Sequence, residues 1–470
     1  MISKTDFLIY LDAPRHLWAV KNNQLDDKER DLYLQHLLNQ GYEVEALAIE
    51  YLREYLMPKY GASKDDVLIQ PTQIDGVYEA RTDILIKNRS GKWDMYEVKS
   101  STKVDKENMY DATFQYLVFS KHYDIENVYI LHLNKEYVRD GDIYLPDLFV
   151  AEDINEGVEK LKEEVIRLRE DAYNISELDD YHKSIACIRP KECPCIFVCH
   201  PKLPDYSIYD INRITGNEGS VRMLEGMGII DVMDVPKNYE LSDKQRFQVD
   251  VAQSGEVYMG KGEIESMFGE LEFPLYFLDY ETFNPAIPLF DGYKPFDHIT
   301  FQYSLHVLEQ NGKLEHYEYL HTEKSDPIPS LLRSLKKVVG NSGSIVVWNK
   351  GFEGSRNKGM GEIYAEYRDF CEDMNSRLFD LMDVFRNQLY DDPKFKGSYS
   401  IKSVLPVLVP ELSYDSLDIS NGSMAMASWY DYVFGKEKDE KIINDLLKYC
   451  ELDTLAMVRV YEEVGRRLDR

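Results

Sequence analysis

A run of apolar residues near the middle of the chain ends in two acidic residues, Asp279 and Glu281. The run predicts a buried strand, on which residues two positions apart point to the same face. Two carboxylates on one face repel each other and are costly to desolvate unless a cation lies between them. The pair therefore indicates a divalent-metal site, and the alternative interpretation is a strand that ends in solvent with two acids on it.

Two later features carry polar groups that could join this pair. Glu353 opens a predicted helix directly after an apolar strand that ends in Asn349. Tyr449 and Asp453 lie in a helical run predicted over residues 441–468. Their spacing of four residues puts both side chains on one face of that helix.

The order and spacing of these residues resemble the signature of the DnaQ-like exonucleases, which have an RNase H-like fold. Asp279, Glu281 and Asp453 fall on three of the four acidic residues of that signature, and Tyr449 falls on its tyrosine. Glu353 stands where the family usually has aspartate. The resemblance implies a 3′–5′ exonuclease of the tyrosine class in the C-terminal part of the chain.

The resemblance also implies the metals. Four carboxylates can hold two Mg²⁺ or Mn²⁺ ions, roughly 3.5–4 Å apart, that activate the attacking water and stabilise the leaving oxygen. Oxygen ligands suit both of these hard cations. By the same resemblance, Tyr449 orients the water.

A second group of residues lies on a hairpin predicted from strands over residues 77–86 and 92–100. Asp83, Glu97 and Lys99 could converge there, because Glu97 and Lys99 share a face by the two-residue rule. The alternative interpretation is an exposed cross-strand ion pair.

With the helix that follows, this hairpin resembles the PD-(D/E)XK nucleases, in particular their RecB-like branch. The resemblance implies that Asp83 and Glu97 bind metal and that Lys99 helps to activate water and stabilises the charge of the transition state. It implies that Gln115, on a helix predicted from residue 111, supports the site. Carboxylates on either side would keep Lys99 charged.

The RecB-like pattern has a histidine on its first helix, four residues after a glycine. Here the matching position after Gly41 is Glu45, with Glu43 as an alternative. The resemblance therefore implies Glu45, or alternatively Glu43, as the first-helix metal ligand.

Four of the six cysteines lie within thirteen residues: Cys187, Cys193, Cys195 and Cys199. Such clustering in a protein expected to be cytoplasmic indicates a metal or iron–sulfur site rather than a disulfide scaffold. RecB-like nucleases of the CRISPR-associated kind hold a [4Fe–4S] cluster whose N-terminal cysteine precedes a Pro-Arg/Lys pair. Ala13 occupies that position here. Three outcomes stay open: a four-cysteine cluster that uses Cys195, a zinc site with or without His200, or no metal.

Charge and hydropathy limit the partners and the cellular location that can be expected. The net charge of −29 argues against a general nucleic-acid binder and predicts weak, salt-sensitive binding of nucleic acid unless the basic residues are clustered. The same charge fits a protein partner with a basic surface. No apolar run approaches the ~18 residues that span a membrane, and the N-terminus has no signal-peptide pattern. We expect a cytoplasmic protein.

The length and motif order predict an α/β protein of three parts. A PD-(D/E)XK domain with the cysteine cluster is expected over 1–202, a helical connector over 203–268, and the exonuclease domain over 269–470. The connector contains a Gly-centred stretch, 224–236, that is typical of either a helix–hairpin–helix or a plain linker. Nearly the whole chain resembles a bacterial family catalogued only as a domain of unknown function.

These features predict a metal-dependent nuclease with two sites, acting in DNA repair or defence. Single-stranded DNA is the expected substrate, and RNA is the alternative because no sugar-reading residue can be identified. The rival hypothesis is a nucleic-acid or protein-binding scaffold in which one or both sites are inactive.

Overall fold

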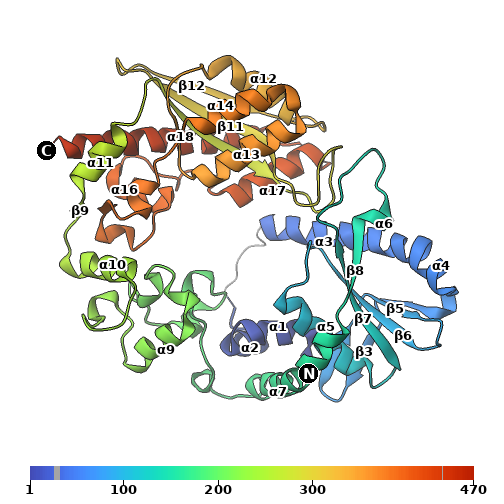
Figure 1. Ribbon diagram of the computed structural model, residues 1–470. Coiled ribbons are helices and arrows are strands. Elements are labelled where there is room, and N and C mark those ends of the chain that lie inside the picture. Colours follow the sequence, from blue (N-terminus) through green and yellow to red (C-terminus); the bar gives the residue numbers. More distant parts are fainter. Residues whose placement is uncertain (26–31, 437, 470) are drawn as a thin grey trace. The chain divides into compact units, whose positions relative to one another are not determined.

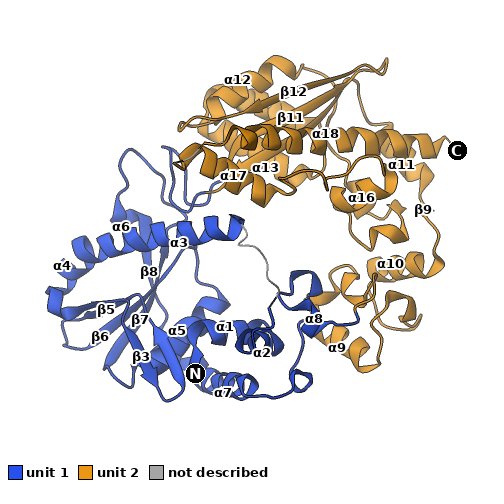
Figure 2. Cartoon of the chain, turned by 180° about the vertical axis from the view of Figure 1, so that it is seen from behind, with its two compact units in different colours: residues 1–202, 285–297 blue, residues 203–284, 298–470 orange. Residues whose placement is uncertain are grey.

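The computed structural model describes residues 1–25, 32–436 and 438–469 as a mixed α/β protein (Figure 1). The chain forms two compact units, which are coloured separately in Figure 2. Unit 1 comprises residues 1–202 and 285–297, and unit 2 comprises residues 203–284 and 298–470. The predicted α/β class is confirmed.

Unit 1 is built on a five-stranded sheet of order β2-β5-β6-β7-β8. Its strands are β2 (Val67–Ile69), β5 (Ile84–Lys87), β6 (Trp93–Lys99), β7 (Ile125–Leu133) and β8 (Phe149–Asp153). Only β6 and β7 are parallel, and the helix α5 (Lys106–Phe119) connects them. Two parallel neighbours need a crossover connection of about a dozen residues or more, usually a helix, and α5 supplies it.

Both faces of this sheet are buried. Met95 and Ile130 pack with residues of α1 (Lys4–Asp12), α5 and α7 (Asn155–Ser176), whereas Tyr96 and Leu131 pack with residues of α3 (Leu32–Tyr51). The alternation follows the two-residue period of a strand. Glu97 and Lys99 continue the series that begins at Met95, so both point toward α1 and α5.

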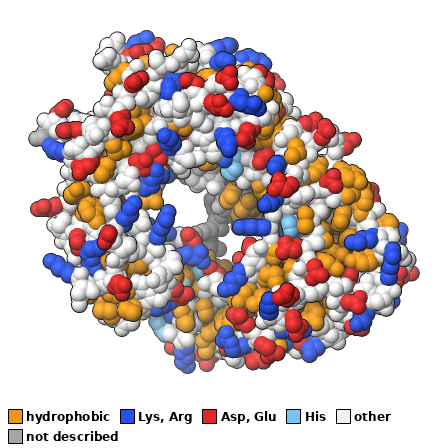
Figure 3. All heavy atoms as spheres, viewed as in Figure 1, with side chains coloured by type: hydrophobic (Ala, Val, Ile, Leu, Met, Phe, Trp, Pro, Cys, Tyr) orange, Lys and Arg blue, Asp and Glu red, His pale blue; other side chains and the backbone are white. Residues whose placement is uncertain are grey.

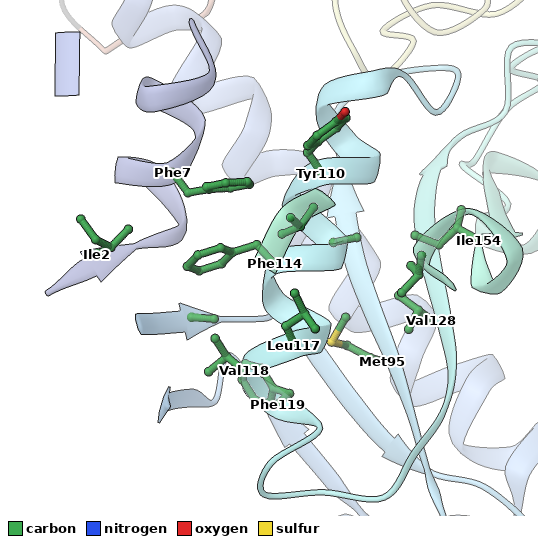
Figure 4. Close-up of a cluster of buried hydrophobic side chains, with 14 of the residues drawn as sticks. Ile2, Phe7, Met95, Tyr110, Phe114, Leu117, Val118, Phe119, Val128 and Ile154 are labelled. Atoms are coloured by element: carbon green, nitrogen blue, oxygen red, sulfur yellow. The ribbon is translucent and has the colours of Figure 1, made fainter. Parts of the chain in front are cut away.

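Aromatic packing fixes α1 against α5. The rings of Phe7 and Phe114 stack with their centroids 4.9 Å apart, within the cluster drawn in Figure 4. Ser3 caps α1, because its hydroxyl accepts a hydrogen bond from the backbone N–H of Asp6 at 3.1 Å. The first turn of α1 therefore has a defined place beside the sheet.

The prediction of one strand over residues 77–86 is wrong. The chain breaks at Thr82 and Asp83, between β4 (Tyr78–Arg81) and β5. β4 belongs to a separate small sheet with β1 (Ile2–Ser3) and β3 (Thr72–Asp75). At the break, the Asp83 carboxylate, rather than a backbone carbonyl, accepts the Val98 N–H at 2.7 Å. A side chain thus replaces the ladder hydrogen bond that would have continued the strand.

Unit 2 contains a second five-stranded sheet, of order β12-β11-β10-β13-β14. Its strands are β10 (Leu275–Phe283), β11 (Ile299–Leu308), β12 (Leu314–Leu320), β13 (Ile345–Val347) and β14 (Leu378–Asp380). β10 pairs antiparallel with β11 and parallel with β13. The predicted buried strand at 275–283 is confirmed.

Helices pack around this sheet: α12 (Ile328–Val338), α13 (Lys350–Ile363), α14 (Arg368–Ser376), α16 (Ile401–Leu408), α17 (Gly422–Phe434) and α18 (Glu440–Leu468). α18 lies against β10 and β11, and α16 lies against α18. The helix predicted to open at Glu353 is present as α13, which begins three residues earlier at Lys350, and the helix predicted over 441–468 is present as α18.

The first part of unit 2 is helical, with α9 (Glu218–Gly226), α10 (Asp243–Ser254) and α11 (Lys261–Phe268). Gly228 has a left-handed backbone, with φ +76°. After this turn the chain forms only a 3₁₀ turn over Val232–Asp234 before α10 begins. Two residues of this part, β9 (Tyr258–Met259), pair with β15 (Tyr390–Asp391).

The surface is charged, and no helix in the described ranges is long and apolar enough to cross a membrane. On the face drawn in Figure 3, acidic side chains are interspersed with lysine and arginine rather than gathered on one side.

Candidate active sites and metal centre

Four carboxylates from three elements meet in unit 2. Phe277 of β10 contacts Tyr461 of α18, so Asp279 and Glu281, which continue its face, also point toward α18. α18 supplies Asp453, and the first turn of α13 supplies Glu353. The structure therefore brings together all four acids that the sequence assigned to this site.

The electrostatics of these acids show how close they are. Burial, and then the charges of Asp453, Glu281 and Glu353, hold the pKa of Asp279 well above its usual range. Burial and Asp453 raise the pKa of Glu281 to about 8, and burial raises the pKa of Glu353 to about 8. For Asp453, burial raises the pKa to about 6. Burial is the largest cause for each of the four groups, and repulsion by the other acids of the site adds to it for Asp279 and Glu281.

The donor atoms fit a divalent cation. One ligand atom each from Asp279, Glu281 and Cys450 lie within 4.8 Å of one another. The Cys450 thiol donates to Asp279 Oδ2 at 3.6 Å. The buried Glu353 Oε2 has no hydrogen-bond partner among the residues that the structure describes. A buried carboxylate oxygen without a donor is the kind of atom that a metal ion satisfies.

Three side chains that sequence reasoning did not assign also line this site. Tyr414 donates to Asp453 Oδ1 at 2.5 Å, and Lys402 Nζ lies 3.3 Å from the Tyr449 hydroxyl. Lys402 also lowers the pKa values of Glu281 and Asp453 by its charge. The third is Cys450, which lies three positions before Asp453 on the same helix face, and this spacing was a usable signal.

Tyr449 is buried beside Asp453, one turn earlier on α18. Both groups are positioned by the helix, as their spacing predicted. Asn349 caps α13, because its side-chain oxygen accepts the Phe352 N–H at 3.3 Å. This cap sets the helix start, and therefore the place of Glu353 in the first turn.

Unit 1 contains a second polar site on the face of its sheet that is covered by α1 and α5. Lys99 Nζ lies 3.0 Å from Glu97 Oε1 and 2.5 Å from Asp111 Oδ2. Glu97 and Asp111 are 2% and 1% exposed. The alternative of an exposed cross-strand ion pair is therefore wrong.

α1 adds a second lysine to this site. Lys4 Nζ lies 2.7 Å from Glu97 Oε1 and 3.8 Å from Asp111 Oδ2. Burial lowers the pKa of Lys99, but the charges of Glu97 and Asp111 outweigh it and hold that pKa above its usual range. Lys99 is therefore a fixed cation.

Gln115 supports the site from the next turn of α5. Its amide donates to Asp111 Oδ1 at 2.8 Å. Gln115 Oε1 and Glu97 Oε2 are both buried, and within the described ranges neither has a hydrogen-bond partner. These two oxygens could accept from a ligand or bind a cation.

Asp83 and Glu45 lie at the edge of this group. Burial raises the pKa of Asp83, and the negative charge of Glu45 adds to the rise, so these two acids are neighbours. Glu45 accepts a hydrogen bond from the Gln70 side chain. Glu43 is exposed, whereas Glu45 is half-buried and its charge acts on Asp83, so the structure brings Glu45 rather than Glu43 to the site.

Sequence reasoning missed Lys4 and Asp111. Asp111 lies four residues before Gln115, on the same helix face, and this spacing was a usable signal. Lys4 lies 93 positions from Glu97. No local pattern connects two residues so far apart.

The cysteine cluster gathers in unit 1. Cys193 Sγ lies 4.0 Å from Cys195 Sγ, which lies 3.7 Å from Cys199 Sγ. Cys187 Sγ lies 3.4 Å from His200 Nε2. All four thiols are buried and none forms a disulfide. Ala13, at the position where a cysteine was expected, is buried in the same cluster.

A third group of potential ligands lies in unit 2: His306, His316 and Glu451. The two imidazoles stack with centroids 4.5 Å apart. One nitrogen of each ring contacts a hydroxyl group, Thr454 Oγ1 at 2.8 Å and Ser304 Oγ at 2.9 Å. Sequence reasoning did not identify this group.

Comparison with known proteins identifies relatives but no activity. Residues 276–400 match a family model described as a domain of unknown function, DUF2779. The chain is 26% identical over 294 residues to an uncharacterized protein, UU173, of Ureaplasma parvum serovar 3. It is 26% identical over 221 residues to an uncharacterized Mycoplasma pneumoniae protein, the MG366 homolog. The expected relation to bacterial proteins of unknown function is confirmed.

These matches are partial. They cover 56% and 42% of this chain, and 41% and 33% of the two relatives, so the chain spans less than half the length of either. A solved structure titled "Crystal structure of SSO0001" is 18% identical, with 43% of this chain and 87% of that chain covered and a TM-score of 0.25. A likeness at that TM-score does not identify a fold.

Proposed function

We propose that this protein is a metal-dependent nuclease that hydrolyses phosphodiester bonds of nucleic acid. Unit 2 is its 3′–5′ exonuclease, with an RNase H-like fold, and unit 1 is a second nuclease of the PD-(D/E)XK type. The observation that carries the proposal is the convergence of Asp279, Glu281, Glu353 and Asp453, whose pKa values are all raised. Such an arrangement of acids is typical of a functional site.

The four acids would hold Mg²⁺ or Mn²⁺. The unpartnered Glu353 Oε2 and the mutual repulsion of the other three support this assignment. When bound, two such ions supply activation of water and stabilisation of the leaving oxygen. In unit 1, Glu97 and Asp83 would hold a cation of the same class.

The remaining side chains of the unit 2 site position these acids and the substrate. The Tyr414 hydroxyl holds Asp453 by its hydrogen bond, and the Lys402 ammonium lies next to Tyr449. Tyr449 would orient the attacking water. A pocket of about 410 Å³, lined in part by Lys402, Tyr414 and Ser420, borders these groups and has room for part of a nucleotide.

In unit 1, Lys99 would stabilise the negative charge that develops on the phosphate. Its ammonium is fixed between Glu97 and Asp111, so no reorganisation is needed when that charge appears. Gln115 keeps Asp111 in place. DNA is the proposed substrate of this unit, and single-stranded DNA or RNA that of unit 2.

End-labelled single-stranded DNA, duplex DNA and RNA, incubated with Mn²⁺, test the proposal. We expect a ladder from the 3′ end with the wild-type protein, and its loss in Asp453→Asn. Glu462→Gln is the matched control, because it makes the same carboxylate-to-amide change at a 42% exposed site on the same helix. Wild-type protein that cleaves none of the three substrates would refute the proposal.

The second site is tested by Lys99→Met, with Lys103→Met as an exposed control a few residues away. Duplex cleavage that survives Asp453→Asn should vanish when Lys99→Met is added. If Asp453→Asn/Lys99→Met and Asp453→Asn/Lys103→Met cleave duplex DNA equally, unit 1 does not contain the second nuclease site.

One observation favours a second candidate function for unit 1, namely binding of nucleic acid without cleavage. Lys4 already bonds to Glu97 at 2.7 Å, so two lysines neutralise the acids that a metal would otherwise need to balance. In that case duplex DNA binds to wild-type and Lys99→Met proteins but is cut by neither.

A further inference from the structure

The strongest site outside the proposed nuclease centres lies where the cysteine cluster meets α2 (Pro14–Lys21). One ligand atom each from His16, Cys193, Cys195 and Cys199 lie within 4.8 Å of one another. His16 is 4% exposed, and the three thiols are at most 5% exposed. This group contains a histidine that the cysteine spacing alone does not reveal.

The position of His16 explains why Ala13 can stand where a cysteine was expected. Both residues face the cluster, because they lie three positions apart at the start of α2. Ala13 has no donor atom. His16 Nε2 instead lies 3.3 Å from Cys193 Sγ.

The spacing of the donors fits a single ion. Bonds of about 2.3 Å to sulfur and 2.0 Å to nitrogen in a tetrahedron place two sulfurs ~3.8 Å apart and a sulfur and a nitrogen ~3.5 Å apart. The observed separations are 4.0 and 3.7 Å between sulfurs and 3.3 Å between Cys193 and His16. A [4Fe–4S] cluster binds each thiolate to a different iron, which separates the thiolates by the width of the cluster. The site is too narrow for that.

A second contact orients the imidazole. His16 Nδ1 lies 2.6 Å from Asp12 Oδ2, so Nδ1 carries the proton and Nε2 offers its lone pair to the thiols. A carboxylate on the far nitrogen of a ligating histidine is the usual support in zinc sites. Arg189, from the cysteine-bearing segment, holds the other oxygen of Asp12 at 2.6 Å.

We propose that His16, Cys193, Cys195 and Cys199 form a closed, structural Zn²⁺ site in which Asp12 orients His16. Four buried donors leave no open coordination position, and such closed sites are structural rather than catalytic. Three thiolates and one neutral imidazole give the zinc site a net charge of −1. The Arg15 guanidinium, which bonds to the Cys199 carbonyl at 3.4 Å, partly offsets this charge.

Cys187 lies outside this ligand set. Its sulfur contacts His200 at 3.4 Å and also interacts with His16, Cys193 and Cys199, but it is not among the four donors that all lie within 4.8 Å of one another. A tetrahedral ion accepts only four donors. Cys187 therefore distinguishes the zinc site from a four-thiolate cluster, which would need it.

The test is metal analysis and X-ray absorption on full-length protein purified anaerobically. We expect one zinc and no stoichiometric iron per chain, with three sulfurs at about 2.3 Å and one nitrogen at about 2.0 Å around the zinc. Iron with inorganic sulfide, four sulfurs around zinc, or no metal would each overturn the proposal. This readout is independent of nuclease activity.

Variants sharpen the test. Cys187→Ser should keep one zinc, Cys195→Ser should lose it, and His16→Cys should keep it with four sulfurs in the absorption spectrum. Asp12→Asn should weaken zinc retention against a chelator by about 10- to 100-fold. Loss of zinc in Cys187→Ser, or full retention in Cys195→Ser, would contradict the assigned ligands.

Discussion

The Tyr414 hydroxyl donates a hydrogen bond to Asp453 Oδ1 at 2.5 Å, across 39 positions of the chain. Burial raises the pKa of Asp453, and the bond from Tyr414 opposes that rise by stabilising the carboxylate. Tyr414 thus helps to keep Asp453 ionised among three other acids. An ionised carboxylate is the form that binds a divalent cation.

Replacement of Tyr414 by phenylalanine should therefore slow 3′-end trimming by about 10-fold or more, as for other supporting contacts of metal ligands. Because Asp453 loses a bond to its charged form, its pKa should rise. The acidic limb of the pH–rate profile should then move to higher pH. Rates from pH 5 to 9 measure this shift, and Tyr317→Phe on the exposed face of β12 is the control. An unmoved profile would show that Tyr414 has no electrostatic role.

Metal-free protein should lose stability as the pH rises from about 4.5 to 8. Burial and Asp453 raise the pKa of Glu281 to about 8 in the folded protein, whereas the unfolded value is near 4.5. The folded state therefore binds more protons in this window, and its free energy of unfolding falls with increasing pH. Melting temperatures in EDTA should decrease across the window, and added Mg²⁺ should restore stability most at pH 8.

Glu281→Gln is the variant that isolates this effect. It removes the titrating group but retains a neutral side chain of similar size, so the decrease between pH 4.5 and 8 should become smaller. Glu462→Gln, on the exposed face of α18, should leave it unchanged. Identical slopes in Glu281→Gln and the wild type would contradict the assignment.

The sequence predicted the elements that carry local chemistry. Asp279 and Glu281 lie on one strand, and Tyr449 and Asp453 on one helix, so period and spacing alone placed them. Tyr414 comes from a loop, and no periodicity marks it. His16 was hidden for a similar reason, since its partners lie 177 positions away. Contacts of this range are determined by tertiary packing and not by local pattern.

The missed strand break at Asp83 has a different physical origin. The apolar alternation of residues 77–86 is continuous, but the Asp83 side chain takes the Val98 N–H that a strand would have used. Side-chain hydrogen bonds of aspartate to the backbone compete with regular ladders. The hydrophobic pattern of a strand gives no sign of such a side-chain hydrogen bond.

Lys4→Met should destabilise the protein by about 1–3 kcal/mol, the range for a hydrogen bond to a charged group. The Lys4 side chain is 27% exposed, and its carboxylate partner Glu97 is buried. Lys99 still bonds to Glu97, so the loss should be smaller than for an isolated buried charge. Urea unfolding measures it, with the exposed Lys121→Met as the control. Equal midpoints for both variants would contradict the stabilising role of Lys4.

Asn349→Ala should lower stability by about 1 kcal/mol, because it removes the side-chain cap of α13. The frayed first turn would also displace Glu353, so exonuclease activity should fall more than stability alone explains. Asn349→Asp retains a capping oxygen and should restore the free energy of unfolding. If alanine and aspartate behave alike, the cap does not determine the position of Glu353.

Removal of the proposed zinc should destabilise unit 1 and weaken its polar site. The ion would join His16 to Cys193, and cross-links that close long loops remove much conformational freedom from the unfolded chain. α2, which carries His16, follows α1, which carries Lys4, with only Ala13 between them. Release of α2 should therefore loosen the contact between Lys4 and Glu97.

A strong zinc chelator should lower the melting temperature of wild-type and Cys187→Ser proteins by several degrees. His16→Ala should already melt at the lower temperature and should not respond. If the chelator does not change the melting temperature of the zinc-loaded wild type, the ion does not stabilise the fold.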